Sequence, residues 1–397
     1  MAFSLAVIII LGLIFNWIFE KMKLPGLLGM LILGVIIGPY GLNWLFTDFL
    51  LTDDVIKLSS DFRKIALIVI LLRAGFGIKK ETLEKVGIPA LKLSCIPGVM
   101  EGFAVTGLGM YFLDLHFIEA GMLGFIIAAV SPAVVVPSML SLVERGKGKV
   151  KGIPTMILAG ASIDDVIAIT IFSTFLGMYG GKQINIGRQL LSIPISIILG
   201  TLIGAVIGLG LSWLFKKYSF RDTKKILIIL SIAILYTKFE EVMEPYVHIA
   251  SLLGVMTIGF IILEYYPKVA KRLSEKLNKI WVFAEILLFV LVGAQVNIYV
   301  AFDMGLIGVV IIAGGLLARS LGVWISLIGS ELTPKERLFC VVAYTPKATV
   351  QAAIGAVPLA AGVVSGDLIL AMAVLAIMVT APLGAIGIKT TGEKWLS

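Results

Sequence analysis

The stretch from Ile153 to Tyr179, IPTMILAGASIDDVIAITIFSTFLGMY, places two adjacent carboxylates, Asp164 and Asp165, in the middle of an apolar segment. A charge that faced lipid at this depth would cost about 3 kcal/mol. No Lys or Arg lies between Gly152 and Tyr179 to neutralise either acid. The pair must therefore be balanced by a base from another segment, by a proton or by a cation.

The composition defines the setting of this segment. Of 397 residues, 59% are hydrophobic and 15% are charged, and the mean hydropathy is +1.05. A soluble core cannot use so much apolar surface. A spanning helix needs about 20 mostly apolar residues, and the chain offers about 13 such segments. We therefore expect an all-α polytopic membrane protein that forms a single unit over residues 1–397.

The formal net charge of +8 comes from basic residues in short connections, not from one basic domain. Of 33 Lys and Arg residues, 23 lie in alternate connections and six in the intervening ones. The positive-inside rule then predicts an N-terminus outside and a C-terminus in the cytoplasm. We expect a multi-pass protein of the cell (inner) membrane that contacts lipid, binds no nucleic acid and, having no nucleotide-binding motif, binds no nucleotide.

A few charged residues lie at membrane depth. Arg73 and Lys92 are close enough to the span ends for their side chains to snorkel to the interface. Arg319 and Lys347 lie deeper, as do Glu101 and the two aspartates. Ionisable groups at such depth pair with one another or mark an ion path.

The chain also repeats itself. Residues 129–136, AVSPAVVV, align with residues 343–350, AYTPKATV, at an offset of 214 (343 minus 129). Gly75 to Ile78 resembles Gly293 to Val296 at an offset of 218, which also separates Glu101 from Arg319. The matched spans are seven apart, and an odd separation gives the two halves opposite orientations. This is the inverted repeat of secondary transporters.

Prolines interrupt the repeated spans. Proline removes an N–H group from the helical ladder, and the freed carbonyls are tolerated only where protein or a water-filled cavity satisfies them. We expect two broken helices that cross at the midplane, where their half-helix ends present opposed partial charges. The breaks are predicted at Pro132 with Pro137, and at Pro346 with Pro358.

Three strings resemble one transporter family. They are SPAVVVPSML at 131–140, SIDD at 162–165 and TPKATVQAA at 345–353. Together they resemble the NHA-type sodium/proton antiporters of the monovalent cation:proton antiporter superfamily. The resemblance covers essentially the whole membrane domain. It implies a homodimer in which each protomer has a dimerisation domain and a core domain that carries the ion by an elevator movement.

The resemblance also implies roles for individual residues. Asp165 is expected to be the principal ion and proton site, and Asp164 is expected to pair with Lys347. Ser131 and Thr349 would be neighbouring oxygen donors.

Two further expectations concern the division of the molecule. The pair Glu101 and Arg319 resembles an interdomain ion pair that bridges moving and static parts. The ion-carrying core would comprise residues 64–179 and 280–388, and the dimerisation part residues 1–60 and 189–270.

Elementary chemistry supports the same mechanism. A hard monovalent cation prefers oxygen ligands, so Asp164 and Asp165 are candidate ligands of Na⁺ or Li⁺. Protons and cations then compete for one site, and alternating access converts that competition into exchange. We expect a transporter that carries Na⁺ or Li⁺ and H⁺, is not an enzyme and needs no cofactor.

Two alternatives use the same residues differently. A sodium-coupled solute symporter would share the crossed helices but would need a pocket for an organic substrate. An intramembrane aspartyl protease would need carboxylates on different helices that share a proton. Adjacent residues on one helix point about 100° apart, and the chain has no Gly-x-Gly-Asp string, so the protease reading is disfavoured.

Overall fold

The computed structural model describes residues 2–22, 26–41, 51–78, 80–179, 186–243, 246–295 and 298–396. Within these ranges every regular element is a helix. Val296, the last residue of the second glycine string, lies outside them. The helices are α1 (Ala2–Lys21), α2 (Gly26–Ile37), α3 (Asp53–Lys57), α4 (Ser59–Gly77), α5 (Lys80–Phe112), α6 (Phe117–Ala128), α7 (Pro132–Glu144), α8 (Ile153–Tyr179), α9 (Ile186–Lys217), α10 (Asp222–Met243), α11 (Ser251–Tyr265), α12 (Pro267–Ala294), α13 (Ile298–Ser326), α14 (Pro334–Ala343), α15 (Thr349–Ile354), α16 (Val357–Ala360) and α17 (Gly366–Trp395).

The membrane character of the chain follows from these helices. In the part of the chain that the structure describes, eight helical segments are long and apolar enough to cross a bilayer, and three shorter apolar helices accompany them. The all-α membrane fold is therefore confirmed, while the number of about 13 spans stays a prediction.

Two of the predicted spans are broken helices, as expected. In the first, α6 ends at Ala128, Ala129 and Ser131 adopt extended backbone, and Pro132 opens α7. In the second, α14 ends at Ala343 and α15 begins only at Thr349. Proline at the first turn of a helix is tolerated because its N–H would have no helical partner.

The other two prolines differ from each other. Pro137 lies inside α7, which continues past it to Glu144 without interruption. Pro358 lies in the first turn of the short α16, beyond the end of α15. Pro137 therefore removes one hydrogen bond from the helical ladder of α7 without ending the helix.

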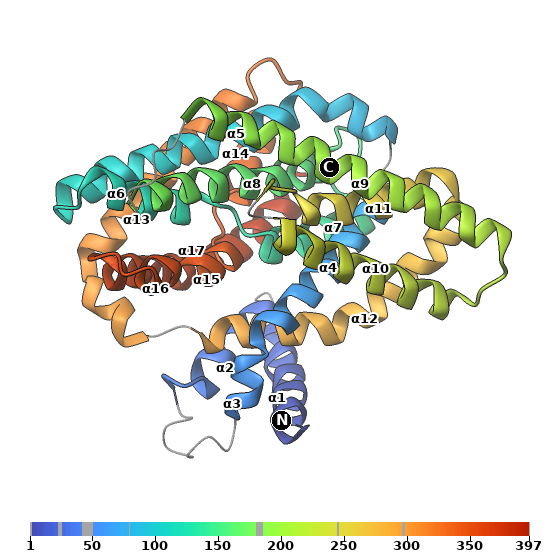
Figure 1. Cartoon of the computed structure of the whole chain (residues 1–397), viewed down its shortest axis with the longest axis horizontal. Helices are drawn as coiled ribbons and strands as arrows, with labels where there is room; N and C mark the ends of the chain where they lie inside the picture. Colours follow the sequence, from blue (N-terminus) through green and yellow to red (C-terminus); the bar gives the residue numbers. More distant parts are fainter. Residues whose placement is uncertain are drawn as a thin grey trace.

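The helices pack in two groups. The bundle helices, α5–α8 and α13–α17, are centred on the long contact between α5 and α13. The frame helices are α1, α2, α4 and α9–α12, in which α4 packs on α11 and α12 and α2 packs on α12. In Figure 1, α1 and α2 lie in the lower part of the view beside one end of α12, and α5 lies at the top.

Glycines at equivalent positions of the two halves allow the frame helices to touch. A Cβ on Gly75 of α4 would lie 2.0 Å from the carbonyl oxygen of Met256 in α11. A Cβ on Gly293 of α12 would lie 2.1 Å from the carbonyl oxygen of Leu31 in α2. Small residues at membrane helix crossings permit such backbone contact. The repeated glycine string thus marks two equivalent crossings, α4 with α11 and α12 with α2.

Gly75→Val and Gly293→Val should each destabilise the protein by about 1–3 kcal/mol, because the new side chain collides with a backbone carbonyl. The measurement is the midpoint of thermal unfolding in detergent. Gly210→Val in α9 is the matched control, since a Cβ there meets nothing within 4 Å. Equal midpoints for Gly210→Val and the other two variants would contradict the role of these crossings.

Candidate functional site

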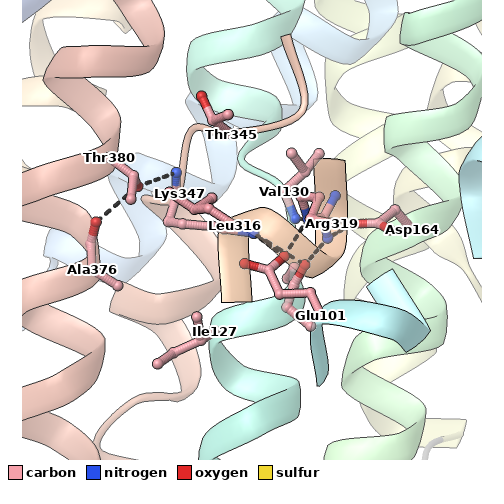
Figure 2. Close-up of polar contacts among 12 residues, drawn as sticks. Glu101, Ile127, Val130, Asp164, Leu316, Arg319, Thr345, Lys347, Ala376 and Thr380 are labelled. Carbon is pink, nitrogen blue, oxygen red and sulfur yellow. Dashed lines mark hydrogen bonds and ion pairs between the residues drawn. The ribbon is translucent and has the colours of Figure 1, made fainter. Parts of the chain in front are cut away.

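Four charged side chains meet where the broken helices cross. Glu101 comes from α5, Asp164 from α8, Arg319 from α13 and Lys347 from the extended segment before α15. Each is at most 1% exposed. Figure 2 shows the four groups pointing toward one another from these separate elements.

The contacts among them alternate in charge. Lys347 Nζ donates a hydrogen bond to Glu101 Oε2 over 2.6 Å, and Arg319 Nε donates to the same oxygen. Arg319 Nη2 lies 3.3 Å from Asp164 Oδ2, which also accepts from the N–H of Val130 over 3.0 Å. Both bases also donate to the carbonyl oxygen of Ala128. Two acids and two bases therefore cancel within one connected network.

The partners in this network differ from one prediction. Asp164 was expected to pair with Lys347, but its ion-pair partner is Arg319, and Lys347 pairs with Glu101. The fork of the Arg319 guanidinium explains the difference, because its separate nitrogens reach both carboxylates at once. Lys347, which has a single ammonium group, pairs with Glu101 alone.

The predicted pair of Glu101 and Arg319 does form. It joins α5 to α13, which pack along each other within the bundle helices. This packing does not favour the predicted role of the pair as a bridge between moving and static parts, which stays a prediction. The pair neutralises two charges that are buried among the bundle helices.

The backbone of the crossing is satisfied by the opposite half. The N–H of Ser131 donates to the carbonyl oxygen of Pro346 over 2.8 Å, and the hydroxyls of Ser131 and Thr349 lie 3.4 Å apart. Gln351 Nε2 donates to the carbonyls of Ile126 and Ala129, each over 2.9 Å. Carbonyls freed by the first break are thus bound by a side chain that follows the second.

A threonine fixes the position of Lys347. The backbone N–H of Lys347 donates to Thr380 Oγ1 over 2.9 Å, and that hydroxyl donates to the carbonyl of Ala376 over 2.7 Å (Figure 2). Sequence reasoning missed Thr380 and Gln351, because neutral polar residues carry no charge signal. The available clue for Gln351 was its position. A side-chain amide five residues after Pro346 can donate to the backbone carbonyls that a helix break leaves unpaired.

Asp165 has a different environment from its neighbour. It lines a cavity of about 230 Å³, together with Pro132 and Thr349. Its Oδ1 is buried and has no hydrogen-bond partner among the described residues. Consecutive residues of a helix diverge by about 100°, so Asp164 points into the charge network while Asp165 points into the cavity. Ser131, the other predicted oxygen donor, is fully buried and does not line this cavity.

Comparison with known proteins identifies the family of this chain. The model of the transmembrane sodium/hydrogen exchanger family matches residues 5–394. The chain belongs to the sodium/hydrogen exchanger family. Within it, the chain is an NHA-type sodium/proton antiporter of the monovalent cation:proton antiporter superfamily, as the sequence strings predicted.

Several animal exchangers are similar over most of their length. Sodium/hydrogen exchanger 9B2 of Mus musculus is 32% identical over 395 residues, which cover 94% of this chain and 69% of the relative. The 9B2 exchanger of Xenopus tropicalis is 34% identical over 388 residues, covering 93% and 69%. Sodium/hydrogen exchanger 9B1 of Homo sapiens is 30% identical over 354 residues, covering 85% and 67%.

The fold is that of a solved antiporter. The structure of the sodium proton antiporter MjNhaP1 from Methanocaldococcus jannaschii at pH 8 superposes with a TM-score of 0.76. It covers 98% of this chain and 97% of its own, at 21% sequence identity. The similarity supports the predicted fold with inverted repeats and two broken helices.

Glu101→Gln should reduce the free energy of unfolding by about 3–5 kcal/mol, because it leaves two buried bases facing one acid. Thermal unfolding in detergent measures the loss. The exposed pair of Glu393 with Arg145 provides the control, since Glu393→Gln should cost about 1 kcal/mol or less. A Glu101→Gln variant as stable as Glu393→Gln would show that the network does not stabilise the fold.

Proposed function

We propose that this exchanger carries Na⁺ or Li⁺ against H⁺, and that Asp165 binds the cation and the proton in turn. The observation that supports this assignment is the charge balance of the site. Glu101, Asp164, Arg319 and Lys347 neutralise one another, whereas Asp165 lines the cavity outside their network. An uncompensated carboxylate at membrane depth requires a counter-ion, and a proton or a sodium ion meets that need equally.

Oxygen atoms around Asp165 suit a hard monovalent cation. Thr349 and Ser162, which both carry hydroxyl groups, line the same cavity. Asp164 does not line the cavity, but it stays a second candidate ligand because it is the neighbouring acid and its Oδ1 has no hydrogen-bond partner among the described residues. The hydroxyl of Ser131, which does not line the cavity, lies 3.4 Å from the hydroxyl of Thr349. Binding of the cation at this set displaces the proton, so the two cargoes cannot travel together.

An elevator movement of the bundle helices against the frame helices would provide alternating access. Asp165 belongs to α8, while Leu67 of α4 and Leu253 of α11 form the opposite wall of its cavity. A second cavity, of about 540 Å³, lies between Asn16 of α1 and Ser141 of α7. Both cavities therefore lie between the two groups of helices, where sliding would open one and close the other.

This proposal revises the predicted division of the chain. The C-terminal parts of α4 and α12 lie within the ranges assigned to the ion-carrying core, 64–179 and 280–388, yet both helices pack mainly on frame helices. We assign them to the static part, with α1, α2 and α9–α11. Homodimer formation would use this part, in a cell (inner) membrane with the N-terminus outside.

Asp165→Asn should abolish exchange, because the amide neither takes up a proton nor carries the charge that holds a cation. The measurement is collapse of a preformed pH gradient in proteoliposomes on addition of NaCl, LiCl or KCl. Intact protein should dissipate the gradient with sodium or lithium and the variant should not.

Equal dissipation by both proteins would reject Asp165 as the carrier. Should neither respond, sodium-dependent uptake of an organic solute becomes the next measurement, as symport requires. Thr174→Val in α8 is a control for folding, since this hydroxyl bonds only to the carbonyl of Thr170 within its own helix.

Cross-linking tests the elevator movement. In a variant without Cys95 and Cys340, cysteines at Asn16 and Ser141 join the frame to the bundle across one cavity. A flexible bis-maleimide linking them should stop exchange. The control links Ser141 to Ala385 of α17, which lines the same cavity from within the bundle, and should leave exchange intact. Inhibition by both links or by neither would contradict the movement.

A further inference from the structure

Another cavity lies at one end of the bundle helices and shares no lining residue with the two cavities described above. Its volume is about 390 Å³, and it is lined by the first part of α5, by Lys151 and Met156 at the start of α8, and by the connection between α13 and α14. Lys80, Lys151 and Lys335 stand at the starts of α5, α8 and α14, and the positive-inside rule assigns such basic connections to the cytoplasm. The cavity therefore lies on the side of the inner leaflet.

Two lysines of α5 line this cavity without an acidic partner. Lys85 and Lys92 are about two turns apart and so lie on one face of the helix. Lys85 Nζ donates a hydrogen bond to the carbonyl oxygen of Val150 over 3.1 Å. Lys92 has no hydrogen bond or ion pair among the described residues. Both ammonium groups therefore keep N–H donors that the protein does not use.

Two ion pairs remove other charges of the cavity from the balance. Lys151, the third lysine of the lining, pairs with Glu336 over 2.7 Å. Glu84, which also lines the cavity, has its Oε1 3.9 Å from Lys80 Nζ. Each pair sums to zero, so neither attracts a charged ligand.

The remaining charges of the lining sum to +1. They are Lys85, Lys92 and Glu331 (two positive charges minus one negative charge). Glu331 accepts a hydrogen bond from Lys151 through its backbone carbonyl, and its carboxylate forms no ion pair among the described residues. The cavity is therefore complementary to a ligand that carries one negative charge.

Apolar side chains surround the opening of the cavity. Ile88 of α5 and Ile328 of the connection line it and are 71% and 61% exposed, and Leu91, beside Lys92, is 65% exposed. In a membrane protein, such side chains contact acyl chains. Basic pockets between membrane helices on the cytoplasmic side suit the phosphate of a lipid headgroup. A free phosphate ion would gain nothing from the apolar surroundings.

We propose that this cavity binds the headgroup phosphate of an anionic phospholipid from the cytoplasmic leaflet. Lys85 and Lys92 donate hydrogen bonds to the phosphate oxygens, and the acyl chains lie against Ile88 and Leu91. The site includes no residue of the proposed carrier site. Asp165→Asn should therefore keep the lipid preference, so that failure of this inference and failure of the carrier assignment are distinguishable.

Fluorescence quenching by a brominated lipid measures occupancy at this position. The protein, in a variant without Cys95 and Cys340, carries a bimane label on Leu91→Cys, which is beside the cavity but does not line it. A label on Leu383→Cys of α17, where the leucine is 64% exposed, reports ordinary lipid contact on the same bundle. The vesicles contain phosphatidylcholine and increasing fractions of brominated phosphatidylglycerol. Phosphatidylglycerol should be preferred about fivefold at Leu91→Cys, the effect of one charge near the membrane surface, and hardly at Leu383→Cys.

Substitutions in the cavity should change this preference in opposite directions. Lys92→Gln should lower it about fivefold, whereas Lys92→Arg keeps the charge and should retain it. Glu331→Gln removes the unpaired acid and should raise the preference about fivefold. Lys394→Gln is the matched control, because Lys394 is an exposed base at the end of α17 that does not line the cavity.

Three results would overturn the lipid site. Equal preferences at Leu91→Cys and Leu383→Cys would reject it, as would equal effects of Lys92→Gln and Lys394→Gln. Glycerol 3-phosphate, which has the phosphate without acyl chains, should not displace the brominated lipid, and displacement would show that the cavity binds a free phosphate instead. Lys92→Gln should unfold in lipid-free detergent at the same temperature as the intact protein, whereas a lower midpoint would give Lys92 a structural role in place of lipid binding.

Discussion

Cancellation of charge in a dry interior is the constraint on which the rest of this structure depends. Two acids and two bases meet at the crossing, and each is at most 1% exposed. Leaving one of these charges without its partner would reduce the free energy of unfolding by about 3–5 kcal/mol. Two of the groups, Glu101 and Asp164, come from the first half of the repeat, and Arg319 and Lys347 come from the second. The network therefore joins the halves and fixes how α5, α8 and α13 are rotated against one another. It also leaves Asp165 as the one midplane carboxylate of the described chain that is outside the network.

The two broken helices must likewise have their backbone polar groups paired within the protein. Each break frees carbonyl and N–H groups that lipid cannot satisfy. The chain meets this demand across the repeat, through the bond from Ser131 to Pro346 and the bonds from Gln351 to the first break. An irregular backbone at the midplane is stable because the opposite half supplies its partners, and the same irregularity exposes Thr349 to the cavity.

Local rules made much of this fold predictable from sequence. Pro132 and Pro346 removed ladder donors at matched positions, and the offset between Glu101 and Arg319 correctly indicated that they meet. Partner choice within the network was not predictable, because it depends on helix rotation and on the reach of Arg319, which span spacing does not encode. The prediction that residues 64–78 and 280–294 belong to the ion-carrying core was not reliable for a related reason. These segments are apolar like the bundle spans, and their packing against frame helices through Gly75 and Gly293 shows only in the structure. Gln351 and Thr380 act through single hydrogen bonds that leave no mark in a charge count.

The contact between Glu101 and Arg319, which lie 218 residues apart, has a consequence for the symmetry of the repeat. Glu101 faces Arg319, so each of the two lies near the pseudo-two-fold axis and meets its own counterpart. In a symmetric dimer of identical halves, such a residue would meet a copy of itself. Neither glutamate nor arginine tolerates that arrangement, because like charges repel in a buried site. The acid–base pair at the axis therefore requires two halves of different sequence, which a single covalent chain provides.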